Sequence, residues 1–119
     1  MVDRVRIARE GALAKPIAER LRAFPGPIHA WMEAHTRILK EDTYGVVSLL
    51  NTHDAQCVLK YYGFRSRMHA LTYSIGRGRA LHSHRAAGNL RREGVSVPEP
   101  LGVLRLPEGM VLLSEAIPG

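Results

Sequence analysis

Alternating hydrophobic and polar residues predict three consecutive strands in the middle of the chain. Thr36–Lys40 leads into a polar turn at Glu41–Gly45, and Val46–Leu50 is an apolar run with two β-branched residues. Turn-forming residues occupy Asn51–Asp54, and Gln56–Tyr62 is predicted as the third strand. Antiparallel strands joined by short turns in this way form a β-meander.

A helix and a second pair of strands are predicted after the meander. An apolar stripe indicates a helix over residues 79–93, and Gly94 stands just past its end. The stripe consists of Ala80, His84, Ala87 and Leu90. Strands are predicted at 101–106 and 110–114, around a hairpin turn at Pro107–Gly109. The expected order is therefore three strands, one helix and two strands.

Residues 1–36 carry a weaker pattern, and we treat them as an N-terminal extension. Val2–Ile7 alternates imperfectly, which suggests a short edge strand. Apolar residues recur at helical spacing over 15–24, and Phe24–Pro27 then breaks the chain. The predicted fold class is α+β: a five-stranded antiparallel sheet with one main helix over residues 37–119, preceded by the extension.

Composition narrows the classes of function. The chain has 119 residues and a formal net charge of +6, with a sequence pI of about 10.1, which favours an anionic partner. Its single cysteine, Cys57, excludes an internal disulfide framework. No apolar run approaches the roughly 18 residues of a membrane span, and the charged start is unlike a secretory signal. We therefore expect a cytoplasmic protein.

Lys60 is the most informative residue for chemistry. It follows Cys57, Val58 and Leu59 in the third predicted strand, so its ammonium group would project from a mostly apolar strand. This tetrapeptide resembles the Val-Ala-Ile-Lys strand of kinases, in which the lysine binds the α- and β-phosphates of ATP. A lysine on a strand is more often simply solvated, so the surrounding sequence has to decide.

The stretch from Ile38 to Gly119 resembles the lipopolysaccharide kinase family, which includes heptose and Kdo kinases and has a protein-kinase-like fold. Besides the lysine strand, the resemblance lies in Arg79–Ala87, in the connector Gly94–Leu101 and in Leu113–Gly119. It covers about two thirds of the chain. It implies that residues 37–119 form the N-terminal lobe of a kinase, ending at the hinge that leads to a second lobe.

The resemblance also implies a nucleotide site. ATP would be the cofactor, with Lys60 on its phosphates and the turn Glu41–Gly45 in place of the glycine-rich loop. The implied nucleotide-binding residues are Lys60, Gly45, Tyr44, Ser114, Glu115 and Ile117. A sugar or glycolipid of the lipopolysaccharide core would accept the phosphate, and the basic residues would contact an anionic membrane surface peripherally.

Two departures from the family pattern bear on activity. Kinases pair the strand lysine with a helix glutamate, but there is no Asp or Glu between Asp54 and Glu93, and the glutamate position falls at Ser83 or His84. The catalytic and metal-binding carboxylates of kinases lie in the second lobe. We therefore predict no catalytic residue in this chain, expect Mg²⁺ only with the missing lobe, and interpret the chain as a fragment that is catalytically incomplete.

Two alternatives to an active kinase lobe stay open, and a third possibility, a metal site, is set aside. A non-catalytic pseudokinase or scaffold remnant would explain the missing glutamate. The arginines between Arg65 and Arg92, with neighbouring aromatic residues, would also suit a small nucleic-acid-binding module, which we favour less. His82 and His84 are two residues apart on the predicted helix and face different directions, so no metal site is predicted there.

Overall fold

The computed structural model describes residues 4–52, 56–64, 79–94 and 97–116. Its mixed α+β architecture agrees with the predicted class. In chain order the elements are β1 (Arg6–Arg9), α1 (Ala14–Ala23), α2 (Ile28–His35), β2 (Arg37–Glu41), β3 (Gly45–Asn51), β4 (Gln56–Gly63), α4 (Arg79–Arg92), β5 (Pro100–Leu106) and β6 (Gly109–Glu115). None of the described helices is long and apolar enough to cross a membrane.

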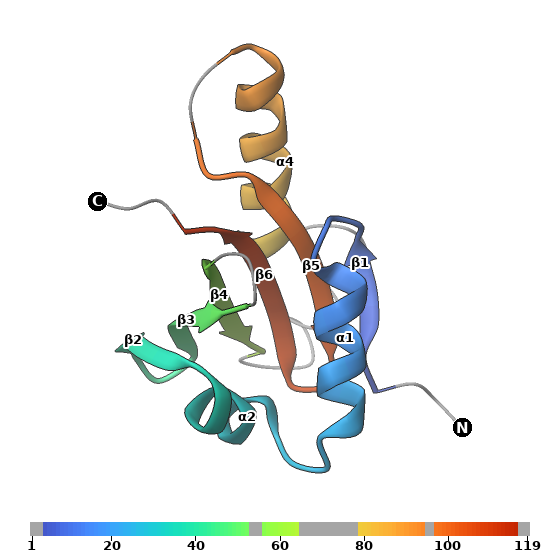
Figure 1. Ribbon diagram of the computed structural model, residues 1–119, viewed down its shortest axis with the longest axis vertical. Helices are drawn as coiled ribbons and strands as arrows, with labels where there is room; N and C mark the ends of the chain where they lie inside the picture. Colours follow the sequence, from blue (N-terminus) through green and yellow to red (C-terminus); the bar gives the residue numbers. More distant parts are fainter. Residues whose placement is uncertain (1–3, 53–55, 65–78, 95–96, 117–119) are drawn as a thin grey trace.

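One sheet organises the fold, and it has six strands where five were predicted. The strand order is β1-β5-β6-β4-β3-β2, and every neighbouring pair is antiparallel (Figure 1). The meander β2–β3–β4 and the hairpin β5–β6 are confirmed close to their predicted bounds. The extra strand is β1, which pairs with β5 instead of standing apart in an extension.

The N-terminal segment is part of the folded body. Helix α1 confirms the predicted helix, whereas α2 was not predicted, because Pro25-Gly26-Pro27 indicated a break and only eight residues follow it in helical form. Pro27 is the N-cap residue of α2 and keeps an extended backbone there. Both helices lie on the same side of the sheet and cover it.

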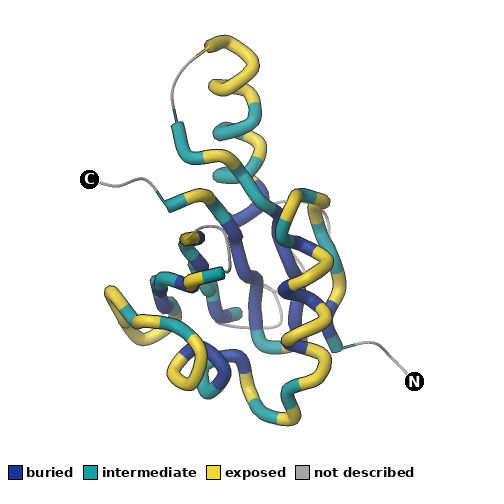
Figure 2. Tube along the Cα trace, viewed as in Figure 1, coloured by how far each residue is buried: buried dark blue, intermediate teal, exposed yellow. Residues whose placement is uncertain are grey.

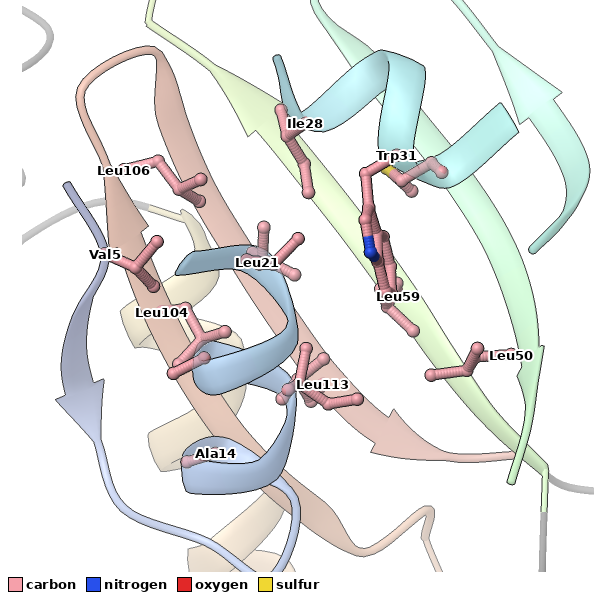
Figure 3. Close-up of a cluster of buried hydrophobic side chains, with 14 of the residues drawn as sticks. Val5, Ala14, Leu21, Ile28, Trp31, Leu50, Leu59, Leu104, Leu106 and Leu113 are labelled. Carbon is pink, nitrogen blue, oxygen red and sulfur yellow. The ribbon is translucent and has the colours of Figure 1, made fainter. Parts of the chain in front are cut away.

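The side of the sheet under α1 and α2 is called the core face. Its strand residues alternate with exposed or half-buried ones, as expected where one face is buried. Figure 3 shows the helix and strand side chains of this cluster pointing toward one another. The fully buried members include Leu21, Trp31, Leu50, Leu59, Leu104 and Leu113.

The opposite side is called the basic face, and α4 covers only part of it. Ala80 and Leu81 at the start of α4 are buried against Val103, Met110 and Leu112 of β5 and β6. Farther along, the stripe predicted for this helix becomes exposed, and Leu90 keeps 39% of its surface. Figure 2 shows the second half of α4 exposed beyond the end of the sheet. Beside α4, strands β2, β3 and β4 have no helix on this face among the described residues.

Candidate functional site

Lys60 lies in the middle of β4 and not at a strand end, since the strand continues to Gly63. It is directly opposite Val47 of β3 on one side and Leu112 of β6 on the other. Leu112 belongs to the cluster under α4, so the register places Lys60 on the basic face. The lysine is half-buried. Its ammonium group therefore emerges from an apolar row beside α4.

Apolar residues surround Lys60 on the same face. Val58 precedes it by two residues, and Val47 and Leu49 lie on the neighbouring strand β3, all of them half-buried. Together they form a shallow apolar floor between Lys60 and the start of β4. Reasoning from the sequence did not identify this floor, because the residues come from two strands whose register was unknown. The sequence did carry one sign of this floor: Val58 and Lys60 are two residues apart on one strand and therefore share a face.

Ser114, one of the implied nucleotide-binding residues, lies on the same face as Lys60. It is opposite Val58 on β4, one row away from Lys60 and Leu112. The structure thus brings together Lys60, Val58 and Ser114. Gly45 also falls on this face, at the first position of β3 and opposite Tyr62.

Glu115 is oriented differently. It is opposite Cys57, a core-face residue, and its N–H donates to the carbonyl of Glu99 at 2.9 Å. The N–H of Glu99 in turn donates to the Glu115 carboxylate at 3.4 Å. The N–H of Glu115 is therefore already used within the protein. Ile117, the other predicted hinge residue, lies outside the described residues.

The turn expected to hold phosphates is tied up by its own carboxylate. The N–H of Asp42 donates to the carbonyl of Gly45 at 2.9 Å, which closes a tight hairpin. The Tyr44 N–H donates to Asp42 Oδ1 at 3.0 Å, and the Tyr44 side chain is exposed. A carboxylate that takes up a backbone donor opposes phosphate binding twice, by charge and by occupying the donor. This turn is a weaker phosphate cradle than the sequence indicated.

Neither candidate for the missing helix glutamate contacts Lys60 among the described residues. His84 lies near Arg9 of β1, at the far side of β5 from β4. Burial lowers the pKa of His84, the Arg9 charge lowers it further, and Nδ1 has no hydrogen-bond partner in the described part of the chain. The fold therefore favours the neutral form of His84. Ser83 is half-buried and makes no hydrogen bond to Lys60 in the described part of the chain.

None of the carboxylates on the described strands shares the face of Lys60. Within the described strands, Glu41 and Glu115 occur at register positions opposite the core-face residues Val46 and Cys57. The basic face instead collects cations from four strands. By register these are Arg6, Arg9, Arg37, Lys40, Lys60 and Arg105. Arg105 also lies over the Phe64 ring, 5.4 Å from its centroid.

The remaining residues singled out from the sequence are Cys57 and the arginines between Arg65 and Arg92. Cys57 is buried, and burial raises the pKa of its thiol to about 11 against a smaller opposing effect of Arg20. It is a thiol packed in the core. Of the arginines in the 65–92 run, Arg65, Arg67 and Arg77 lie outside the described residues, while Arg85, Arg91 and Arg92 are exposed on α4.

Comparison with protein-family models, with curated proteins and with solved structures finds no match for this chain. Its function has to be inferred from the arrangement of Lys60, the apolar floor and the basic face.

Proposed function

We propose that this chain is the nucleotide-binding lobe of an ATP-dependent phosphotransferase that resembles lipopolysaccharide core sugar kinases. Lys60 binds nucleotide phosphates, and the carboxylates that bind Mg²⁺ and orient the acceptor come from a second lobe outside residues 1–119. The acceptor is a sugar or glycolipid hydroxyl. Residues 37–116 act as one half of a clamp.

The observation that carries this proposal is the position of Lys60. Protein kinases hold their phosphate-binding lysine on the third strand of the lobe, with a helix following. Lys60 is on the third strand of the meander, and α4 follows β4 in the chain. It emerges half-buried beside Val47 and Val58, with Ser114 one row away, so an apolar base and charged phosphates would both find partners.

The test is ATP titration of the full-length gene product with Lys60→Ala, Lys60→Arg and Lys15→Ala. Lys15→Ala is the matched control, because it removes the same charge as Lys60→Ala. Lys15 is exposed on α1, on the core-face side and away from Lys60. Charge-assisted phosphate bonds contribute about 1.5–3 kcal/mol, so Lys60→Ala should weaken ATP binding at least tenfold and Lys15→Ala should not. Equal affinity and turnover in wild type and both Lys60 variants would remove Lys60 from a phosphate site.

Residues 1–119 alone should respond weakly or not at all to ATP in a thermal shift assay, because the proposal places half of the cleft elsewhere. A strong ATP-dependent shift of the isolated chain would contradict the half-clamp arrangement. The role of Lys60 would in that case be decided by the ATP affinities of the Lys60 variants.

A pseudokinase is the second candidate, and the Asp42–Tyr44 hydrogen bond favours it. This turn is closed on its own carboxylate, and among the described residues Lys60 has no acidic partner on its face, so nucleotide would bind without being positioned for transfer. Full-length protein that binds ATP but shows no turnover with any core-sugar acceptor, while Asp42→Asn tightens ATP binding, would support this candidate. Measurable turnover would reject it.

The cation-rich basic face keeps a nucleic-acid-binding module as the third candidate. Titration of a labelled single-stranded oligonucleotide at increasing salt distinguishes it. If single strands are the ligand, Arg37→Ala and Lys60→Ala should each reduce the salt slope by about one, because each removes a phosphate contact. Binding that is equally weak in both variants and in Lys15→Ala would indicate only non-specific charge attraction.

A further inference from the structure

A cluster of one histidine and two glutamates joins α2 to β2, away from the Lys60 face. Nε2 of His29 contacts a carboxylate oxygen of Glu41 and lies 3.6 Å from a carboxylate oxygen of Glu33. The three ligand atoms all lie within 4.8 Å of one another. Figure 1 shows α2 beside β2, the arrangement that brings the cluster together.

The sequence places these side chains together for two separate reasons. His29 and Glu33 are four residues apart on α2, so they share one face of the helix. Glu41 is opposite Val46, whose side chain belongs to the core face, so Glu41 points to the side of the sheet that α2 covers. Helix spacing and strand register together therefore bring the side chains of His29, Glu33 and Glu41 close to one another.

The charge at this point is unbalanced when the imidazole is neutral. In a chain with 17 Lys and Arg against 11 Asp and Glu, neither Glu33 nor Glu41 has a lysine or arginine partner among the described residues. Two carboxylates would then face one uncharged nitrogen. A divalent cation neutralises both charges and takes the imidazole nitrogen as a ligand.

The ligand chemistry selects among divalent cations. Zn²⁺ takes imidazole nitrogen and carboxylate oxygen at about 2.0–2.2 Å, usually in a tetrahedron. Ca²⁺ and Mg²⁺ prefer sites built from oxygen alone. All three side chains are partly exposed, so water can supply the fourth ligand, and the long glutamate side chains can close around an ion without backbone movement.

We propose that His29, Glu33 and Glu41 form a zinc site that fastens α2 to the end of β2. Its ligands lie on the core-face side, and it neither uses Lys60 nor depends on nucleotide binding. Because Glu41 adjoins the turn at Asp42–Tyr44, bound zinc would also restrain that hairpin. The ion would bind the folded chain and not the unfolded one, so it should raise the melting temperature as zinc concentration increases.

The experiment titrates residues 1–119 with Zn²⁺ and, separately, with Co²⁺, followed by calorimetry and by the visible absorption of Co²⁺. The site variants are His29→Ala, Glu33→Gln and Glu41→Gln. The matched controls are Glu19→Gln on exposed α1 and His82→Ala on exposed α4. Each site variant should weaken Zn²⁺ binding at least tenfold and remove the tetrahedral Co²⁺ absorption, whereas both controls should bind like wild type.

Thermal melts give a second readout that does not depend on any variant. Zn²⁺ should raise the melting temperature of the wild-type chain, and equal Mg²⁺ or Ca²⁺ should leave it unchanged. Zinc binding of unchanged affinity in His29→Ala and Glu41→Gln, or a wild-type melting temperature that zinc does not raise, would overturn the proposal. The three residues would then form ordinary surface ion pairs.

Discussion

Side chains alternate between the two faces of the sheet, but one face is packed against helices and the other is largely accessible among the described residues. On the core face, side chains from β3, β4, β5 and β6 interdigitate with α1 and α2 and leave almost nothing exposed. On the basic face, α4 packs on β5 and β6, and among the described residues the neighbouring strands β2, β3 and β4 present half-buried valines and cations without a carboxylate on the same face. Because side chains alternate strictly along a strand, one sequence can specify a stabilising face and an accessible face at once.

The largest expected difference between the faces is in stability. Trp31, on the core face, is 2% exposed, whereas Leu39, at the register irregularity of the outer strand β2, is 49% exposed. Trp31→Ala should lower the free energy of unfolding by about 3–5 kcal/mol. Leu39→Ala should change it by less than about 0.5 kcal/mol.

Urea denaturation followed by circular dichroism measures both variants. Leu59→Ala, also on the core face and fully buried, serves if Trp31→Ala is too unstable to purify. Losses of similar size for the core-face variant and Leu39→Ala would mean that the Leu39 side chain is buried in solution. The comparison between the faces would then fail.

A glycine-to-alanine pair should separate the helices on the two sides. Gly102 has φ +137°, and an added Cβ would stand 2.7 Å from the Cβ of Ala14 on α1. Gly88 lies inside α4, where an added Cβ meets nothing within 4 Å. Gly102→Ala should destabilise by about 1–3 kcal/mol, and Gly88→Ala should stabilise by about 0.5–1 kcal/mol.

Melting temperatures of the two variants therefore shift in opposite directions. A stabilising Gly102→Ala would show that α1 can move away from β5 without cost. A destabilising Gly88→Ala would show that α4 packs against something on its exposed side.

The smallest expected effect is the pH dependence carried by His84 on the basic face. Because burial and the Arg9 charge lower the pKa of His84, the unfolded chain binds a proton there more readily than the folded chain. Stability should therefore be complete above the unfolded value of 6.5 and decline as the pH falls below it toward the folded pKa.

His84→Gln should reduce this decline, and His82→Gln, an exposed neighbour on α4, should not. Urea midpoints at pH 7.5 and 5.5 give the measurement. If wild type and His84→Gln lose the same stability over this interval, the imidazole is more solvated than its position indicates.

Much of the fold could be predicted from local pattern. The meander, the helix from Arg79 and the hairpin around Pro107 each carry their own alternation or turn chemistry, and all three are confirmed. Helix α2 escaped prediction because it is short and follows a Pro-Gly-Pro break, so it depends on the burial of Trp31 and Met32 for its existence. A short edge strand was predicted at Val2–Ile7, but its place in the sheet escaped prediction because the pairing of β1 with β5 joins segments far apart in the sequence.

The site was less predictable than the fold. Lys60 and Ser114 were named as candidates from the sequence, but the apolar floor of Val47, Leu49 and Val58 needed the β3–β4 register. The Asp42 carboxylate that closes the turn was hidden in an ordinary polar run. His29 and Glu33 have a readable helical spacing, yet Glu41 joins them only because α2 covers the core side of β2. Local sequence patterns do not reveal contacts between segments that are far apart in the chain.

The two edge strands, β1 and β2, are built in a way that opposes aggregation of the protein in concentrated solution. Both β1 and β2 are short, and each contains a register irregularity. Arginines and a lysine stand along both, at Arg6, Arg9, Arg37 and Lys40. A kinked, charged border cannot easily accept a strand from another molecule. Both edges of the sheet are thereby protected against edge-to-edge aggregation, even though α4 is the one described helix on the basic face and covers only part of it.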